Sequence, residues 1–127
     1  MKTRKRLPQI AESEWEVMKV LWKKSPLAAR EIIGALETVK DWKPKTVKTL
    51  LNRLVHKGAL AFKKEGKNYI YSHAVTQAEC ARSEGKSFLR RVYDGSPKPM
   101  IAAFIEEEKL TPEDIRELKR ILDKKGG

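Results

Sequence analysis

The chain has 127 residues, of which 40% are hydrophobic, and this is enough apolar material for one compact domain or two small ones. No apolar run approaches the ~18 residues of a membrane span, and the basic start leads into Pro8 instead of an apolar segment, so neither a membrane span nor a secretory signal is expected. The single cysteine, Cys80, leaves no internal disulfide and favours a cytoplasmic address.

The formal charge of +11 is divided unevenly along the chain. Residues 1–75 hold 17 Lys and Arg against 7 Asp and Glu, whereas residues 76–127 hold 11 against 10. A basic half joined to a neutral half indicates two roles, one of which involves a polyanion. Nucleic acid is the expected polyanion, because no segment combines a basic face with the exposed apolar face that binds membrane surfaces.

Three short helices are predicted in the basic half. Apolar residues at helical spacing predict the first over about 12–24 and the second over about 28–38. The third spans 43–57, where Pro44 suits the first helical position and Gly58 suits a left-handed C-cap. Three short helices with tight links, the third of them basic, are typical of a helix-turn-helix unit.

The third helix has two chemically distinct faces. One face is an apolar stripe of Val47, Leu50, Leu51 and Leu54. The opposite face has hydrogen-bond donors and no carboxylate, so it can lie against phosphates and base edges. The residues expected to contact DNA from this face are Lys45, Thr46, Lys48, Thr49, Asn52 and Arg53. Asn52 suits adenine and Arg53 suits guanine, whereas lysines more often hold phosphates. An ordinary amphipathic helix with a solvated basic face is the alternative.

A β-hairpin is predicted after the third helix. Segments 59–64 and 68–72 alternate with a period of two around Gly66. The lysines expected to contact phosphates from this hairpin are Lys63, Lys64 and Lys67. Three helices followed at once by such a hairpin predict a winged helix that binds duplex DNA. The residues that form either an arm along the DNA backbone or a disordered tail are Lys2, Arg4, Lys5 and Arg6.

The neutral half is predicted to contain three amphipathic helices, over 76–93, 97–108 and 112–124. A core this small seldom supplies more than a few kcal/mol. We therefore expect residues 76–127 to be a dimerisation domain. The alternative is that the three helices fold back as part of a monomer. The expected interface residues are Phe88, Leu89, Val92, Met100, Ile101, Phe104, Ile105, Ile115, Leu118, Ile121 and Leu122. The predicted fold is mainly α with a small β-hairpin, comprising a winged helix-turn-helix domain in residues 1–75 and this three-helix domain.

No catalytic or metal-binding pattern is present in the sequence. Two separated histidines and one cysteine lack metal-site spacing, and there is no nucleophile elbow or phosphate-binding glycine loop. We therefore expect no enzyme activity, metal or cofactor. Trp15, Trp22 and Trp42 each lie among apolar neighbours, so we expect them in the core or between helices.

Six segments closely resemble the penicillinase and methicillin-resistance repressor family, namely 14–22, 42–54, 57–60, 86–89, 93–96 and 106–111. They occur in the family's order over nearly the whole chain. The resemblance implies a bacterial winged-helix repressor, dimeric through its last three helices, that binds palindromic operators ahead of β-lactamase or related genes. In this family a membrane sensor triggers proteolysis of the repressor, or a metal ion relieves repression. A protease that inactivates the chain is therefore an implied partner.

The sequence departs from the family at the positions through which repression is relieved in other members. The bond cleaved in antibiotic-responsive members is Asn-Phe, and the matching pair here is Ala103-Phe104. The copper-responsive branch carries Cys-x-Cys near the C-terminus, and this chain has no such pair. The resemblance therefore assigns neither the inducer nor the cleaved bond.

Three predicted helix starts lack the polar N-cap that is usual in the family. Ala11, Ala28 and Lys43 occupy these positions. A missing Ser or Thr cap costs about 1 kcal/mol. Either packing compensates in the basic half, or Ser13 caps the first helix instead.

Two other classes of protein remain as alternatives. A winged-helix protein-interaction adaptor need not keep its third helix free of acidic residues, as this chain does. An RNA-associated basic protein is less favoured, because the basic face lacks the aromatic residues on which single-stranded RNA stacks. The sequence therefore predicts a sequence-specific transcriptional repressor that binds double-stranded operator DNA as a homodimer.

Overall fold

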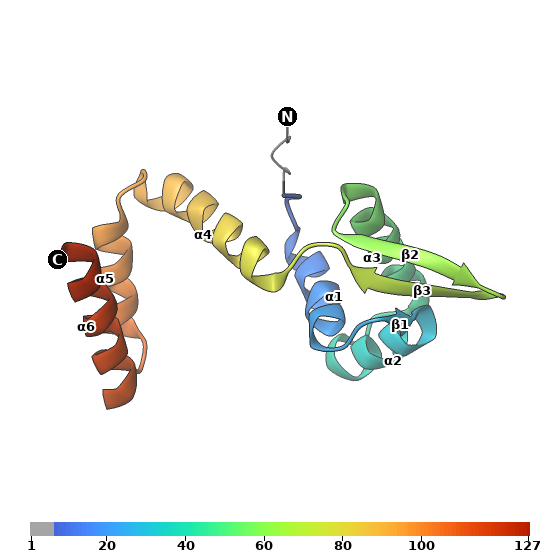
Figure 1. Ribbon diagram of the computed structural model, residues 1–127. Helices are drawn as coiled ribbons and strands as arrows, with labels where there is room; N and C mark the ends of the chain where they lie inside the picture. The colour runs from blue at the N-terminus through green and yellow to red at the C-terminus, as the bar shows by residue number, and fades with distance from the viewer. Residues whose placement is uncertain (1–6) are drawn as a thin grey trace. The chain divides into compact units, whose positions relative to one another are not determined.

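The computed structural model describes residues 7–127, so the predicted arm at residues 2–6 lies outside the described residues. Along the described part of the chain the elements are α1 (Glu12–Lys23), β1 (Leu27–Ala28), α2 (Ala29–Lys40), α3 (Pro44–Lys57), β2 (Leu60–Glu65), β3 (Asn68–His73), α4 (Gln77–Tyr93), α5 (Pro97–Glu107) and α6 (Pro112–Gly126) (Figure 1). The predicted fold class, mainly helical with a small sheet, is confirmed.

The chain forms two compact units, one reaching to Glu84 and the other spanning Gly85–Gly127. The first unit extends into α4 because Cys80 belongs to its core. The sequence placed a domain boundary after residue 75, and that boundary stays a prediction.

The core of the first unit lies between α1, α2, α3 and the sheet. Its fully buried large side chains include Met18, Leu21, Ile32, Leu36, Leu51 and Leu54. The apolar stripe predicted for α3 is buried along its whole length. Trp15, Trp22 and Trp42 are partly buried against this core, as predicted. The Trp22 indole N–H donates a hydrogen bond of 2.9 Å to the Val75 carbonyl.

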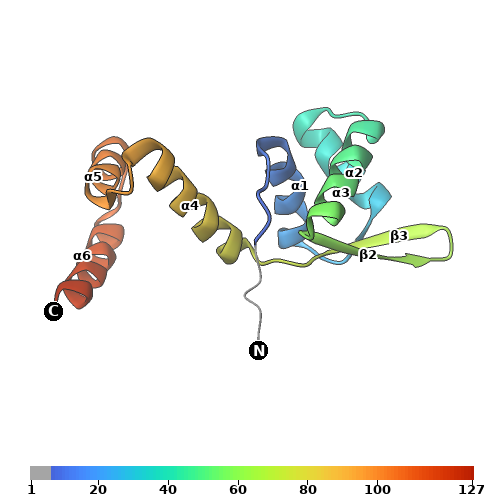
Figure 2. The same ribbon diagram turned by 90° about the horizontal axis from the view of Figure 1, so that it is seen from above.

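The sheet has three antiparallel strands in the order β1-β3-β2. The predicted hairpin is confirmed, with register from Leu60 opposite His73 to Glu65 opposite Asn68. Its tip projects beyond α2 and α3 in both views (Figures 1 and 2). Strand β1 was not predicted, because two residues are too few to show a period.

The ends of the first helices explain how they form without polar N-caps. Ala11 and Ala28 are the N-cap residues of α1 and α2, and neither has a side-chain acceptor. Instead the Glu14 and Glu31 carboxylates each accept the backbone N–H of their N-cap residue at 2.8 Å. These bonds form half of a capping box. The suggestion that Ser13 caps α1 is wrong, because Ser13 lies inside that helix.

The two residues proposed to bound α3 are confirmed in those positions. Pro44 is the first helical residue, where its missing N–H is not needed. Gly58 follows the helix with φ of 87°, a left-handed conformation that side chains disfavour. Its backbone N–H donates to the Val55 carbonyl at 3.0 Å. The helix therefore ends at Lys57, and β2 begins two residues after the glycine.

The second unit has no buried residue along Gly85–Gly127. Its internal packing includes the Phe88 ring, whose centroid lies 6.4 Å from that of Phe104 and 5.9 Å from that of Tyr93. Helix α6 is well capped, because Thr111 accepts the Asp114 N–H and Asp114 accepts the Thr111 N–H. These helices therefore have sound local structure but little core of their own.

Candidate nucleic-acid interface

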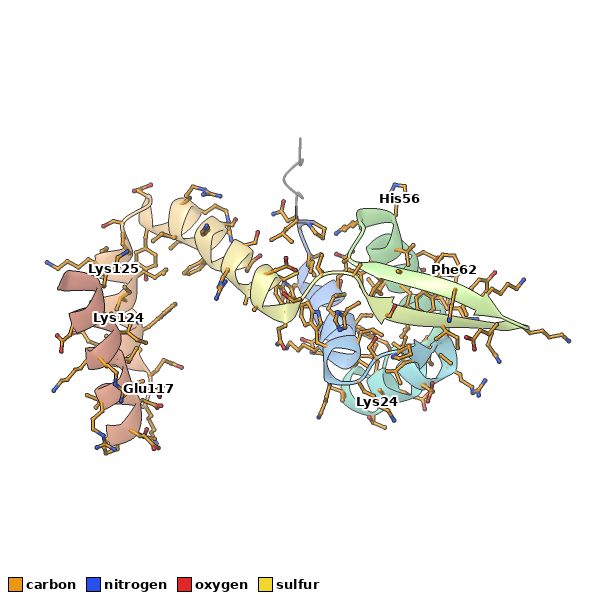
Figure 3. The ribbon with its side chains drawn as sticks, in the orientation of Figure 1. Lys24, His56, Phe62, Glu117, Lys124 and Lys125 are labelled. Atoms are coloured by element: carbon orange, nitrogen blue, oxygen red, sulfur yellow. The ribbon has the colours of Figure 1, made fainter. Side chains whose placement is uncertain are left out.

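The face of α3 opposite its buried stripe is open to solvent. All six residues that the sequence proposed for DNA contact from this helix are exposed, namely Lys45, Thr46, Lys48, Thr49, Asn52 and Arg53. The helix contains no acidic residue, and His56 extends outward near its C-terminal end (Figure 3). The burial of one side by the core thus fixes which side chains α3 can present to a ligand.

The hydroxyl of Thr49 has a defined local partner. Its Oγ1 donates a hydrogen bond of 3.0 Å to the Lys45 carbonyl, one turn earlier. With its hydrogen engaged, this hydroxyl can still accept a bond from a base amino group. The methyl group of Thr49 is also free to contact a thymine methyl. Thr49 is therefore better suited to a base edge than to a phosphate, which carries only acceptors.

A hollow of about 500 Å³ lies beside the N-terminal part of α3. Four of its lining residues, Lys45, Thr46, Thr49 and Arg53, are among those proposed for DNA contact, and Leu50 lies below them. Its remaining walls are Ser13, Trp42 and Lys43. Sequence reasoning did not propose these three, because they lie outside the periodic part of the helix.

A second hollow of about 490 Å³ adjoins the first. Ser13 and Trp42 line both hollows. The second one also contains two carboxylates, from Glu12 and Glu16, with Lys40 as its one cation among the lining residues. The first hollow has three cations and no carboxylate among its lining residues. The charge of the surface therefore changes across Trp42.

The three lysines of the hairpin are exposed but do not share one face. The pairing register places Lys63 opposite Ile70 and Lys64 opposite Tyr69. Because neighbouring residues of a strand point to opposite sides, Lys63 and Lys64 lie on different faces of the hairpin. Lys63 pairs with Glu65 at 3.5 Å, and the Lys64 ammonium lies 5.7 Å from the centroid of the Tyr69 ring. Lys67 lies in the turn and is exposed.

Aromatic side chains support the hairpin on the Lys64 face. The Phe62 ring lies 5.4 Å from that of Tyr69 and 6.0 Å from that of Tyr71, centroid to centroid. Tyr71 is buried, and this burial, with a smaller contribution from Tyr69, raises the pKa of its hydroxyl. The aromatic row connects the projecting hairpin to the core and so holds its lysines in place.

A partly buried ion pair joins the end of α3 to the start of α1. The Glu14 side chain is only 1% exposed, and its Oε1 accepts from the Lys57 ammonium. The same ammonium donates to the Gln9 carbonyl at 2.9 Å. This contact fixes the C-terminal end of α3 against the rest of the unit. Sequence reasoning missed it, because the periodic pattern gives no signal for a pair 43 positions apart.

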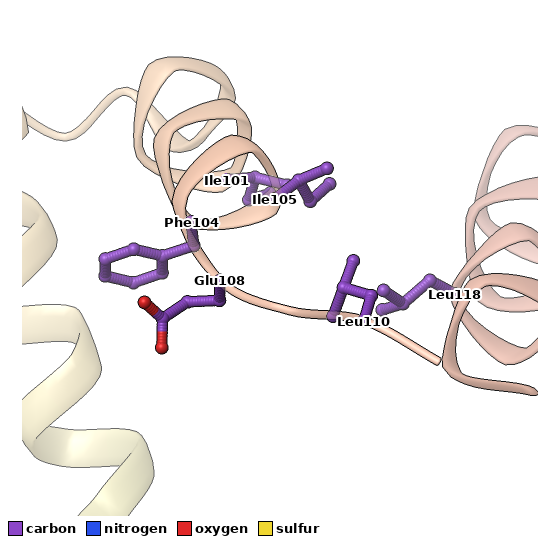
Figure 4. Close-up of a pocket in the computed structure, with 6 residues that line it drawn as sticks. All are labelled: Ile101, Phe104, Ile105, Glu108, Leu110 and Leu118. Carbon is purple, nitrogen blue, oxygen red and sulfur yellow. The ribbon is translucent and has the colours of Figure 1, made fainter. Parts of the chain in front are cut away.

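The apolar residues proposed for a dimer interface lie largely on the surface of the chain. Among them the exposed ones are Val92, Ile101, Phe104, Ile105, Ile115, Leu118, Ile121 and Leu122. Phe88, Leu89 and Met100 are half-buried. Ile101 and Ile105 on α5, Leu110 and Leu118 contribute to one apolar hollow of about 560 Å³ (Figure 4). A soluble chain rarely leaves so many large apolar side chains uncovered without a partner.

Other kinds of site find no support in the described part of the chain. Across residues 7–127, no three His, Cys, Asp or Glu side chains come together in a way that could hold a metal ion. No helix within the same residues is long and apolar enough to cross a lipid bilayer.

Comparison with known proteins agrees with the geometry of this surface. The family described as penicillinase repressor matches residues 10–124. The chain belongs to the penicillinase repressor family. It is 40% identical to the penicillinase repressor of Bacillus licheniformis over 119 residues, which cover 94% of this chain and 93% of that protein. It is 38% identical to the methicillin resistance regulatory protein MecI of Staphylococcus aureus strain N315 over 117 residues, covering 92% and 95%.

Solved structures place the likeness in the first unit. The DNA-binding domain of the repressor BlaI matches with a TM-score of 0.55 and 42% identity, covering 60% of this chain and 93% of that one. The monomeric form of Bacillus licheniformis BlaI in complex with the blaP half-operator matches with a TM-score of 0.52, at the same identity and coverage. The winged-helix assignment is thereby confirmed. The relatives named here are repressors and a regulatory protein, and none is an enzyme.

Proposed function

We propose that the chain is a sequence-specific transcriptional repressor that binds a palindromic DNA operator as a homodimer in the cytoplasm. The observation that carries the proposal is α3, whose apolar stripe is buried while its basic, acid-free face is exposed. The similarity of the first unit to a repressor solved on its half-operator supports duplex DNA as the ligand. A helix of this kind fits the major groove, which is about 12 Å wide.

The proposed roles of the contact residues follow from their chemistry. Asn52 can form two hydrogen bonds to adenine, and Arg53 can form two to guanine. Thr49 supplies an acceptor and a methyl group, because its hydrogen is held by the Lys45 carbonyl. The lysines of α3, Lys45 and Lys48, hold phosphates, with Thr46 beside them. On the hairpin, Lys64 and Lys67 extend the phosphate contacts, and Lys63 does so after leaving Glu65.

The homodimer is supported by the state of the second unit. A stretch of this size with no buried residue cannot supply a stable core by itself. A second copy related by a two-fold axis would present the same apolar side chains and cover both surfaces at once. Two copies also bring two α3 helices to half-sites about one helical turn apart, which accounts for a palindromic operator.

The family likeness supports proteolysis as the way in which the repressor is inactivated and leaves its operator. The bond that matches the family's cleavage pair, Ala103–Phe104, lies within α5, and Phe104 is half exposed. Because Ala103 stands where the family has asparagine, the cut is not assigned to this bond. A cut anywhere in α5 would separate α6 from the winged-helix unit, so pairing and operator affinity should fall together. Mass spectrometry of the chain from cells in which the repressed gene has switched on should find the fragments. Only intact chain in such cells would contradict this mode of release.

The proposed function is tested by fluorescence anisotropy with three labelled ligands. These are the duplex upstream of the chain's own gene, a scrambled duplex of the same length, and a single-stranded RNA. We expect the upstream duplex to bind at least 10³-fold more tightly than the scrambled one, as is usual for specific DNA-binding proteins. Equal affinity for all three ligands would contradict sequence-specific repression. No binding to any of them would favour a protein-interaction adaptor.

A further inference from the structure

We propose that Ser13, Trp42 and Lys43 bind one phosphate of the DNA backbone beside the N-terminal part of α3. This inference rests on the proposed function and extends it to residues outside the recognition helix. Ser13 belongs to α1, whereas Trp42 and Lys43 belong to the link between α2 and α3. The three residues form the walls of the hollow whose other side is α3 itself.

The charge of the hollow selects an anion. Its lining residues include Lys43, Lys45 and Arg53, and no carboxylate. The adjoining hollow beyond Trp42 contains Glu12 and Glu16 with Lys40, and Glu16 also pairs with Lys19, so that hollow attracts an anion less than the α3 side does. The charges therefore favour a phosphate on the α3 side of the tryptophan. The surface is also continuous with the residues proposed to contact bases, so the same duplex reaches both.

Two of the residues that line this hollow have a side-chain donor without a partner in residues 7–127. The indole N–H of Trp22 donates to the Val75 carbonyl, but that of Trp42 donates to no acceptor in residues 7–127. The hydroxyl of Ser13 likewise has no partner among those residues. No buried side-chain nitrogen or oxygen among the described residues lacks a hydrogen-bond partner, so these two unpartnered groups must be accessible to solvent. An indole N–H can only donate, which matches the acceptor oxygens of a phosphate.

A phosphate is a better occupant than a base edge. The donors come from the first turn of α1 and from the link between α2 and α3, whereas Asn52 does not line this hollow. Contacts to phosphates fix the orientation of a helix in the groove without reading sequence. The contact should therefore contribute equally to operator and scrambled duplex, and this separates it from the contribution of a base-reading residue.

The test combines Trp42→Phe with operator duplexes in which one phosphate at a time is replaced by a neutral methylphosphonate. Trp42→Phe keeps an aromatic ring but removes the N–H. We expect it to weaken binding to operator and scrambled duplex alike by about ten-fold, the effect of one bond to a charged group. We also expect one neutral phosphate per half-site to weaken wild-type binding by a similar factor while leaving the binding of Trp42→Phe nearly unchanged.

Two further variants keep the test decisive. Trp15→Phe makes the same chemical change at another half-buried tryptophan that does not line the hollow, and it should stay within two-fold of wild type. Lys43→Gln alters an exposed residue at the N-cap of α3 whose side chain makes no capping hydrogen bond, so the helix should keep its stability. The variant should lower the slope of log affinity against log salt by about 1.

The proposal is overturned if Trp42→Phe binds like Trp15→Phe, or if every neutral phosphate weakens wild type and Trp42→Phe by the same factor. An unchanged salt slope in Lys43→Gln would overturn it as well, even if Trp42→Phe failed to fold. A wild-type chain that binds no duplex at all would refute the proposed function instead, so the two failures are distinguishable. Inorganic phosphate at millimolar concentration should compete only weakly, because it lacks the neighbouring contacts of a duplex. If it competed as strongly against Trp42→Phe as against wild type, the site would lie elsewhere.

Discussion

The partly buried ion pair between Glu14 and Lys57 gives the sharpest prediction about how α3 is held. Lys57→Met keeps the length of the side chain but removes its charge. The Glu14 carboxylate, which is 1% exposed, then retains only the Ala11 N–H among its described partners. Removing one member of a buried pair costs about 3–5 kcal/mol. Because the Lys57 side chain is 33% exposed and water can reach the site, we expect a loss of about 2 kcal/mol in unfolding free energy.

Two comparisons isolate the effect of the pair. Lys19→Met makes the same substitution in the exposed pair between Lys19 and Glu16 on α1, and should change the unfolding free energy by less than about 0.5 kcal/mol. Glu14→Gln combined with Lys57→Met leaves no buried charge. This double variant should therefore lose less than the sum of its single variants, by about 1 kcal/mol or more.

Urea unfolding of the full chain, followed by tryptophan fluorescence, measures these differences. All three tryptophans lie at or before residue 42, so the signal reports the first unit. A loss of about 2 kcal/mol should also lower its melting temperature by roughly 10 °C, because each 1 kcal/mol shifts a small domain by about 4–8 °C. Equal stability of Lys57→Met and Lys19→Met would refute the reasoning, as would strict additivity in the double variant.

The remaining predictions concern DNA, pairing and pH. Arg53→Ala should weaken operator binding by about 1–3 kcal/mol more than it weakens scrambled-duplex binding, whereas Lys64→Ala should weaken both alike; equal losses from Arg53→Ala would remove it as a base reader. Leu118→Asp should yield monomers or unfolded chain in light scattering at micromolar concentration. The control Val39→Asp changes a residue of α2 that is 69% exposed and should remain dimeric. A folded dimer of Leu118→Asp would count against the proposed interface. Because folding raises the pKa of Tyr71, the Tyr71 hydroxyl loses its proton at a lower pH in the unfolded chain than in the folded one. The contribution of Tyr71 to the unfolding free energy is therefore complete below about pH 10 and is lost as pH rises through the folded pKa. Between pH 9 and 11 the unfolding free energy of Tyr71→Phe should fall less than that of wild type. Parallel plots of unfolding free energy against pH for the two chains would contradict the raised pKa of Tyr71.

Periodicity was sufficient to predict the elements that carry the site. The stripe on α3 has a helical period and ends at Gly58, so its buried and exposed faces follow from the sequence directly. The hairpin was equally readable from its period of two and its turn glycine. Strand β1 escaped prediction because it has only two residues and forms by pairing with Tyr71 and Ile70, far along the chain.

Contacts between distant residues could not be predicted in this way. A glutamate in the first turn of α1 suits the helix dipole, and nothing local indicates that Glu14 is buried against Lys57. Trp42 was correctly expected near the core, but its role as a wall of two oppositely charged hollows depends on how α1 and α3 pack together. The pattern of hydrophobic residues determines which faces are buried, whereas pairs of charges depend on tertiary geometry.

The salt dependence of operator binding tests the central claim most directly. The claim is that the exposed cations of α3 and the hairpin engage DNA phosphates while α3 reads the bases. Anisotropy titrations of the full chain from 50 to 300 mM salt should show log affinity falling linearly with log salt, at about 0.9 per phosphate contact. With the contacts proposed here the slope should be steep, and preference for operator over scrambled duplex should persist throughout. A flat response, or a preference that vanishes while binding remains, would contradict the account.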